Sequence, residues 1–402
     1  MKFTLLFGAF PIEQHNDIIS NSITGVQFAA NALQWSIIDG LEENNINIQL
    51  HNLPFIGSYP LRYKKLYYTG RDKCRTAYGT NYKSNKFLNL SLIKMYSRYA
   101  VAKNALFSDV VLNGDQNVIL IYSVNSPFLR AAINFKNKNP KTIICLIVPD
   151  LPEYMSDSQN VFYKYLKRID GVSINKFLVD IDCFVLLTDF MKDKLPILNK
   201  PYVVVEGIYN QNDDIIQYSK KGDGIKQVMY TGTLAKRYGI MNLVNAFHNI
   251  QSENYRLLIC GDGDSRKDII NLSNIDNRIK YLGNLDRKEV LKLQKESDLL
   301  VNPRTQEGDY TKYSFPSKTM EYLASGTPTL LYKLPGIPDE YYDYCYTINS
   351  FSVNEFTYRI EEVLNKPLEE LVTIGNKARD FILEKKNPKT QCGRIIEMIK
   401  NI

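Results

Sequence analysis

The stretch Tyr313–Leu331, YSFPSKTMEYLASGTPTLL, contains the signals that begin and end a helix, followed by an apolar run. Pro316 suits the first turn of a helix, where a missing backbone N–H costs nothing. Gly326 is a residue that commonly ends a helix, and Pro328 prevents its continuation. A helix that leads into a short buried strand is one unit of an α/β sheet.

The start of this predicted helix is suited to an anion. The free amides of Ser317, Lys318 and Thr319 would point at whatever lies before the helix, and a helix N-terminus attracts negative charge. Lys318 strengthens that attraction. Glu321 lies about one turn further on, where its carboxylate would accept hydrogen bonds from a neighbouring hydroxylated group such as a ribose diol. The alternative interpretation is an ordinary capped helix with a surface glutamate.

The alternation of short apolar runs with helical patterns extends along the whole chain, and it predicts two doubly wound α/β domains with mostly parallel sheets. Ligands bind such sheets outside the carboxyl ends of the strands, so a cleft between two facing domains is the expected site. The predicted parts are a Rossmann-like N-terminal domain at 1–209, a linker at 210–226, a second Rossmann-like domain at 227–382, and a C-terminal helix at 383–402 that packs back on the N-terminal domain.

Composition narrows the class of protein. The chain has 402 residues and a net charge of +7, but the segment Arg62–Leu106 holds eleven Lys and Arg against one acid, Asp72. A nucleic-acid binder would spread its basic charge, so no nucleic-acid partner is expected. The six cysteines lie far apart and several stand in apolar runs, which predicts buried thiols in a reducing cytoplasm and no metal centre. No apolar run reaches the ~18–20 residues that span a bilayer.

A second phosphate-directed loop follows the first strand of the C-terminal half, in MYTGTLAKRYGI. Gly232 allows a tight turn, and the adjacent cations Lys236 and Arg237 stand just before a helix, where they oppose its dipole. Such a pair could hold a diphosphate; the alternative is two solvated charges. In ICGDGDSRKDI, Asp262 and Asp264 have a spacing also used for metal–diphosphate binding, although a turn alone explains them.

Four motifs, in order, resemble the retaining glycosyltransferase family 4, also called glycosyl transferases group 1. They are TGTLAKRYGI, LLICGDGD, IKYLGNLDRKEVLKLQKESDLLVNPR and FPSKTMEYLASGTPTLL, and the resemblance covers roughly Gln227–Leu331. The resemblance implies the GT-B fold and a nucleotide-sugar donor with a preference for uridine. It further implies that no cofactor or metal is required.

The resemblance also implies roles for individual residues. Glu321 would bind the donor ribose, Lys236 or Arg237 the diphosphate, and the backbone of Gly283, Asn284 and Leu285 the base. Two glutamates with seven residues between them are typical of the family, but Tyr313 stands where the first is expected. Glu307 or Asp309 could hold the donor sugar instead. The basic pair is also shifted, because Thr233 and Tyr238 occupy the positions where the family often has Arg and Lys.

The N-terminal half offers candidates for the acceptor side. Gly25, at a loop-to-helix junction, would close over the donor diphosphate and the acceptor, or would simply cap the helix. Asp150 follows Pro149 where the family often has His-Asp, so the histidine is missing and Asp150 would orient an acceptor hydroxyl. Glu206 is a second carboxylate at a strand end, and His15 could enter the cleft.

The basic, tyrosine-rich segment Arg62–Leu106 allows two interpretations that do not exclude each other. The stripe at Leu88, Leu92, Met95, Tyr99, Ala102 and Leu106 predicts a core helix, with Lys86, Lys94 and Arg98 on a solvated basic face. The same charges favour contact with an anionic membrane surface or a lipid-diphosphate acceptor.

The sequence therefore predicts a bacterial-type, retaining hexosyltransferase at the inner face of the cytoplasmic membrane. It would use a nucleotide-sugar donor and a glycan or lipid-linked acceptor in surface or capsule polysaccharide biosynthesis. Two alternatives stay open. One is a non-catalytic partner subunit of the same fold, and the other is a sugar-nucleotide epimerase.

Overall fold

The computed structural model describes residues 1–91, 93–108, 116–151, 171, 174–210 and 224–402. The chain forms two compact units. The first contains Met1–Ile208 together with Pro388–Ile402, and the second contains Tyr209–Asn387. Most of the predicted linker at 210–226 lies outside the described residues.

The first unit is built on an eight-stranded sheet in the order β10-β9-β8-β7-β1-β2-β5-β4. All neighbouring pairs are parallel except β4 and β5, which are antiparallel at one edge. The strands are β1 (Lys2–Phe7), β2 (Ile48–Asn52), β4 (Arg71–Arg75), β5 (Asn81–Ser84), β7 (Asn117–Tyr122), β8 (Ile143–Val148), β9 (Cys183–Leu186) and β10 (Tyr202–Val204). A separate antiparallel pair consists of β3 (Tyr67–Tyr68) and β6 (Phe87–Leu88).

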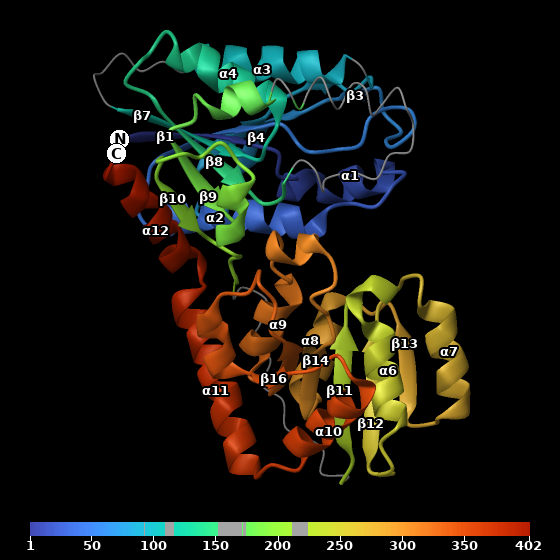
Figure 1. Ribbon diagram of the computed structural model, residues 1–402. Coiled ribbons are helices and arrows are strands. Elements are labelled where there is room, and N and C mark those ends of the chain that lie inside the picture. Colours follow the sequence, from blue (N-terminus) through green and yellow to red (C-terminus); the bar gives the residue numbers. More distant parts are fainter. Residues whose placement is uncertain (92, 109–115, 152–170, 172–173, 211–223) are drawn as a thin grey trace. The chain divides into compact units, whose positions relative to one another are not determined.

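Helices cover both faces of this sheet, with α3 and α4 on one side and α2 and α12 on the other (Figure 1). The described helices are η1 (Ile12–Gln14), α1 (His15–Asn21), α2 (Phe28–Glu43), α3 (Lys94–Ser108), α4 (Ser126–Lys136), η3 (Asp189–Asp193) and α12 (Pro388–Lys400). Alternate residues of β1, such as Phe3 and Leu5, pack against the inward faces of α2 and α12, including Ile37 and Ile395. Burial of this apolar surface from both ends of the sequence stabilises the unit.

The second unit has a six-stranded, fully parallel sheet in the order β13-β12-β11-β14-β15-β16. Its strands are β11 (Lys226–Thr231), β12 (Tyr255–Cys260), β13 (Ile279–Gly283), β14 (Leu299–Asn302), β15 (Thr329–Tyr332) and β16 (Tyr346–Ile348). The chain crosses from β13, at one edge, to β14, on the other side of β11. The strand order therefore reverses beside β11, the kind of position where doubly wound sheets bind ligands.

Two helical layers flank this second sheet (Figure 1). One contains α8 (Arg287–Glu296), α9 (Ser317–Ser325) and α11 (Leu368–Lys385), because α9 contacts both other helices. In the other layer, α6 contacts both α7 and α10; these helices are α6 (Ile240–His248), α7 (Arg266–Ile275) and α10 (Val353–Leu364). Short 3-10 helices are η5 (Lys236–Tyr238), η6 (Asp309–Lys312) and η7 (Asp339–Tyr344).

The helix expected from Lys86 begins only at Lys94, and β6 precedes it. The prediction that Arg98 lies on a solvated basic face is also wrong, because Arg98 is buried (1% exposed). The Arg98 guanidinium donates to the carbonyl oxygens of Leu53 and Pro54, both at 2.8 Å. It also lies 4.9–5.0 Å from the ring centroids of three phenylalanines, Phe55, Phe87 and Phe128.

Candidate functional site

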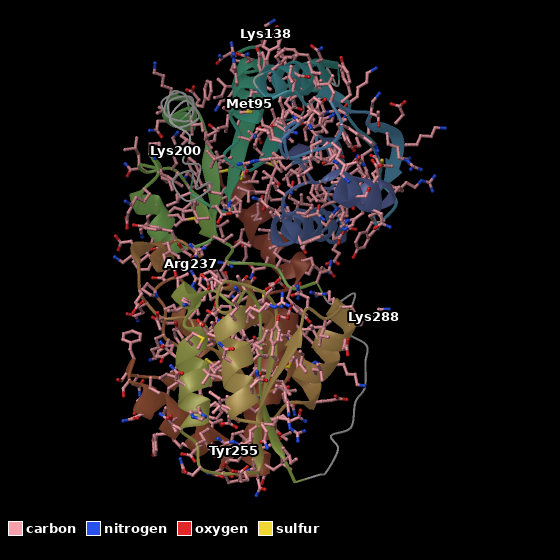
Figure 2. The ribbon with its side chains drawn as sticks, turned by 90° about the vertical axis from the view of Figure 1, so that its right-hand side faces the viewer. Met95, Lys138, Lys200, Arg237, Tyr255 and Lys288 are labelled. Carbon is pink, nitrogen blue, oxygen red and sulfur yellow. The ribbon has the colours of Figure 1, made fainter. Side chains whose placement is uncertain are left out.

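Loops that follow the parallel strands of the second unit gather at one end of its sheet. Figure 2 shows Arg237, which follows β11, and Lys288, near the start of α8, toward one end of this unit, and Tyr255, the first residue of β12, at the other. Because the strands are parallel, the first turn of α9 and the loops after β11, β12, β13 and β14 share the carboxyl end of the sheet. The sequence-predicted donor residues of the second unit lie in these segments and on α9, whereas Gly25 belongs to the first unit.

Glu321 lies at the centre of a small polar network on α9. Its Oε1 accepts hydrogen bonds from Lys318 Nζ and from Gln294 Nε2, both at 2.7 Å. Its Oε2 lies 3.5 Å from Nη1 of Arg287. Burial alone would raise the pKa of this carboxyl group, but the charge and hydrogen bond of Lys318, the hydrogen bond from Gln294 and the charge of Arg287 together lower it. Glu321 is therefore an ionised acceptor with Oε2 the less occupied oxygen.

The helix that carries Glu321 begins and ends close to the predicted residues. Pro316 precedes the first helical residue, Ser317, and Gly326 ends the helix with a φ of 77°, in the left-handed region that glycine tolerates. One expectation about the amides is wrong: the amide of Thr319 donates to the carbonyl oxygen of Pro316 at 2.8 Å, so it is not free for an anion. Thr319 is also buried, and its hydroxyl accepts a hydrogen bond from Asn302. The amides of Ser317 and Lys318 remain the candidates.

The cation pair after β11 lies in η5, immediately before α6. Lys236 Nζ lies 3.0 Å from Asp268 on α7, with both side chains well exposed. Exposed ion pairs contribute only ~0–1 kcal/mol, so an incoming phosphate could displace Asp268. Arg237 is exposed, and its guanidinium lies 5.1 Å from the ring centroid of Tyr238. Both cations are thus available to a diphosphate.

Two glycine loops approach each other closely beside this pair. Gly261 has a φ of 139°, and a Cβ added to it would lie 1.8 Å from the carbonyl oxygen of Gly232. The two aspartates that follow belong to the same turn. Asp264 accepts a hydrogen bond from the amide of Lys236 at 2.8 Å, and Asp262 accepts one from the amide of Gly263 at 2.9 Å. The Asp264 carboxylate therefore holds the loop that carries Lys236, whereas the Asp262 carboxylate stabilises its own turn.

The predicted base-reading segment follows β13. Gly283 has a φ of 70°, Asn284 is exposed and Leu285 is half-buried against the core of the second unit. The amide of Gly261 donates to the carbonyl oxygen of Gly283 at 2.9 Å, so this segment adjoins the glycine loop after β12.

The loop between β14 and α9 contains the candidates for the donor sugar. Glu307 and Asp309 are both exposed, and Asp309 pairs with Lys312 at 3.2 Å. Tyr313 is half-buried at the end of η6. The substitute for the family's first glutamate stays a prediction.

A cation that the sequence analysis did not single out anchors this same loop. The guanidinium of Arg304 lies 5.4 Å from the ring centroid of Tyr238 and 5.1 Å from that of Tyr310. Its Nη2 donates to Ser314 Oγ at 2.6 Å. Arg304 thereby connects the loop after β14 to the η5 turn that holds the cation pair.

Gln294 and Arg287, both on α8, were likewise missed. Gln294 is fully buried, and its Nε2 also donates to Thr231 Oγ1 at 3.0 Å. The sequence contains one indication that Gln294 is buried. It follows Leu291 at a helical spacing of three, so its amide falls on the apolar stripe of α8. Its partner Glu321 is 27 residues away, and only the fold brings the two together.

In the first unit, Asp150 follows β8 at the carboxyl end of the sheet. The side chain is exposed, yet neighbouring protein atoms displace enough water to raise its pKa. Burial, and to a lesser degree the charge of Asp150, raises the pKa of Tyr122, the last residue of the adjacent strand β7. A tyrosine and a carboxyl group thus lie near each other at this edge.

The other first-unit candidates lie on different elements. The ring of His15, at the start of α1, stacks on Phe28 with centroids 6.2 Å apart. Gly25 is exposed, and the cap of α2 is Gln27, so the interpretation of Gly25 as the helix cap is wrong. Glu206 is buried (3% exposed), with little surface for an acceptor.

No group of three or more His, Cys, Asp and Glu side chains among the described residues could hold a metal ion. Within the same residues, no helix is long and apolar enough to cross a membrane. The six cysteines are buried and free.

Solved structures of glycosyltransferases share this architecture. Sucrose-phosphate synthase from Thermosynechococcus elongatus is 14% identical with a TM-score of 0.62, covering 100% of this chain and 99% of that one. The Anabaena protein HepE in complex with UDP is 12% identical with a TM-score of 0.59, and 100% of each chain is covered. The lipopolysaccharide outer core galactosyltransferase WaaB is 13% identical with a TM-score of 0.64, covering 100% of this chain and 99% of that one. The chain has the GT-B fold, and the predicted fold class is confirmed.

Residues 211–381, nearly the whole second unit, match the model described as glycosyl transferases group 1. The second unit is thus similar to the glycosyl transferases group 1 family, as the sequence motifs predicted. No curated protein sequence matches the chain.

Proposed function

We propose that this protein is a retaining glycosyltransferase that moves a sugar from a uridine diphosphate sugar to a glycan or lipid-linked glycan in surface polysaccharide biosynthesis. The observation that carries the proposal is the ionised Glu321 on the same helix as the anion-binding amides of Ser317 and Lys318. An acceptor for a ribose diol and donors for a phosphate are thus one helical turn apart. Among similar structures, HepE is in complex with UDP, and an E. coli trehalose-6-phosphate protein is bound with UDP-2-fluoro glucose, which supports uridine as the base.

The reaction breaks the bond between the anomeric carbon and the donor's β-phosphate oxygen. Negative charge then develops on the leaving diphosphate, where Lys236, Arg237 and the start of α9 would stabilise it more strongly than in the ground state. The acceptor hydroxyl oxygen bonds to the anomeric carbon on the same face, and its proton passes to the leaving phosphate. These cations perform the charge stabilisation that a metal ion supplies elsewhere, so we expect no metal requirement. Asp150 would orient the acceptor hydroxyl.

A membrane-facing acceptor is supported by a surface that we call the basic-aromatic surface, residues 57–68, 86–91 and 93–97. It carries no acidic residue. Its exposed apolar side chains include Leu61 (81% exposed), Tyr67 (58%) and Tyr96 (69%). Its exposed cations are Arg62, Lys64, Lys65 and Lys86, and of these Lys65 pairs with Asp17. Apolar side chains surrounded by cations suit an anionic lipid surface.

Binding and transfer assays test the proposal. Nucleoside diphosphates and sugar nucleotides should raise the melting temperature as ligands that bind only the native state do. Glu321→Ala should abolish that shift, whereas Lys292→Ala, an exposed change on α8, should leave it intact. Vesicles with anionic lipids should bind the protein, and Lys64→Glu with Lys86→Glu should weaken that binding. Absence of any nucleotide binding and of sugar transfer would overturn the proposal.

A non-catalytic partner subunit is the second candidate, favoured by Tyr313 at the position of the family's first glutamate. It predicts that Glu321→Ala leaves biological activity intact while changes on the protein surface abolish it. An epimerase would convert the sugar nucleotide without any acceptor, and product analysis would reveal that.

A further inference from the structure

We infer that Gln294 is a positioning residue for ribose recognition: its buried amide fixes the carboxylate of Glu321 so that Oε2 faces the diol of a bound nucleotide. The inference rests on the proposed function and adds to it a residue on α8, outside the α9 motif.

Gln294 connects two elements of the site. Its Nε2 donates to Glu321 Oε1 at 2.7 Å and to Thr231 Oγ1, at the end of β11, at 3.0 Å. Thr231 is in turn bonded through its amide to the hydroxyl of Tyr322, the neighbour of Glu321 on α9, at 2.7 Å. The backbone carbonyl of Gln294 also accepts a hydrogen bond from Thr327 Oγ1 at 2.8 Å. The residue is thus held at both its backbone and its side chain.

The direction of the amide follows from its partners. A reversed amide would place an oxygen against the carboxylate of Glu321, where only a donor is favourable. Gln294 Oε1 is buried and has no hydrogen-bond partner among the residues that the structure describes. Burying an unsatisfied acceptor is unfavourable, so packing alone does not explain a glutamine here. What the glutamine contributes is its two N–H groups, which donate hydrogen bonds to Thr231 and Glu321.

The other two partners of Glu321 are of a different kind. Lys318 and Arg287 are long, charged side chains that are 38% and 54% exposed, whereas Gln294 is fully buried. The exposed cations can turn toward a phosphate when a nucleotide enters. Gln294 cannot leave, so it keeps Oε1 occupied and leaves Oε2 as the oxygen open to the ribose hydroxyls.

The test compares ribose with dideoxyribose. Uridine, guanosine, adenosine and cytidine diphosphates are titrated against the full-length protein, and the tightest binder is paired with its 2′,3′-dideoxy analogue. In Gln294→Leu and Gln294→Met, we expect the preference for the ribose form to fall about tenfold, while affinity for the dideoxy form changes little. A general loss of folding would lower both affinities together, so the ratio separates positioning from stability.

Two further variants give the contrast. Lys318→Met should weaken the ribose and dideoxy forms by the same factor, because that side chain can turn to the phosphates that both share. Lys292→Met, exposed on the same helix as Gln294, should change neither affinity. An unchanged ribose preference in both folded Gln294 variants overturns the inference and leaves the proposed function intact. Failure of all four diphosphates to bind the unaltered protein overturns the proposed function, and the inference with it.

Discussion

The ammonium nitrogen of Lys318 lies 2.7 Å from Oε1 of Glu321, three residues further along α9. A cation suited to phosphate and a carboxylate suited to ribose therefore neutralise each other when no ligand separates them. A nucleotide would exchange this internal pair for two external ones, its phosphate for the Lys318 ammonium and its ribose for the Glu321 carboxylate. This arrangement avoids leaving an isolated carboxylate in a mostly buried position.

The pair makes stability depend on pH. The folded-state pKa of Glu321 is lowered from its ordinary value of 4.5, so its stabilising contribution is present above that value and is lost as pH falls through the folded pKa. Glu321→Gln lacks this contribution. We expect the variant to be less stable than the unaltered protein by about 1 kcal/mol at pH 7, with the difference narrowing below about pH 4.5. Urea unfolding at several pH values measures it, and a constant difference down to about pH 3 would contradict it.

Lys94 predicts a second rise of stability with pH, in the first unit and above pH 7. Burial, followed by the charges of Arg98 and Arg62, lowers its pKa from 10.5 to about 7. The unfolded chain therefore binds more protons between these two values, and stability rises with pH across that window. We expect a rise of roughly 2 kcal/mol in the free energy of unfolding from pH 7 to 9, and Lys94→Met should remove it. Lys86→Met, at an exposed position, should keep the rise.

Arg98 should stabilise the folded state of the first unit. Replacement by Met leaves the carbonyl oxygens of Leu53 and Pro54 without their donors inside a cage of three phenylalanine rings. We expect a loss of about 3 kcal/mol in the free energy of unfolding, measured by chemical denaturation. Nucleotides should still raise the melting temperature of this variant, because the candidate nucleotide-binding residues on α9 and after β11 belong to the second unit. Retention of full stability in Arg98→Met would show that the cage does not depend on the cation.

Gly261→Ala should separate the two glycine loops. Its φ of 139° disfavours a side chain, and the new methyl group would lie 1.8 Å from the carbonyl oxygen of Gly232. The loop that carries Lys236 would have to move, so we expect both a lower melting temperature and weaker binding of nucleoside diphosphates. Gly25→Ala is the matched control for stability, because a Cβ there meets no atom within 4 Å and the melting temperature should not change.

The fold class and the order of the second unit could be predicted because its strands are short apolar runs bounded by glycine turns. The segment Arg71–Arg75 gave no such signal, since four of its five residues are exposed and its sequence is RDKCR. It becomes a strand only because it pairs with β5 at the sheet edge. Edge strands of this kind depend on tertiary pairing rather than on their own pattern.

The site could be predicted only in its local parts. The spacing of Pro316, Glu321 and Gly326 lies within one helix, so the sequence alone placed the carboxylate relative to the helix start. Gln294 and Arg304 depend on partners brought together by the fold. Arg98 is the converse case: a charged residue on a helix is normally solvated, but here aromatic rings from three other segments surround it.

The C-terminal helix α12 contributes Cys392, Ile395 and Ile399 to the core of the first unit. A Cβ added to Gly40, on α2, would lie 2.3 Å from the carbonyl oxygen of Pro388, which shows how closely the two helices approach. On the ribosome, the segment that completes this core emerges after the entire second unit. Until α12 emerges, an apolar face of the first unit therefore stays exposed to solvent. All residues of the second unit are available once Asn387 has emerged. The core of the first unit can therefore be completed only after the second unit has been synthesised, and a chain that ends before Pro388 would lack the helix that covers this apolar face.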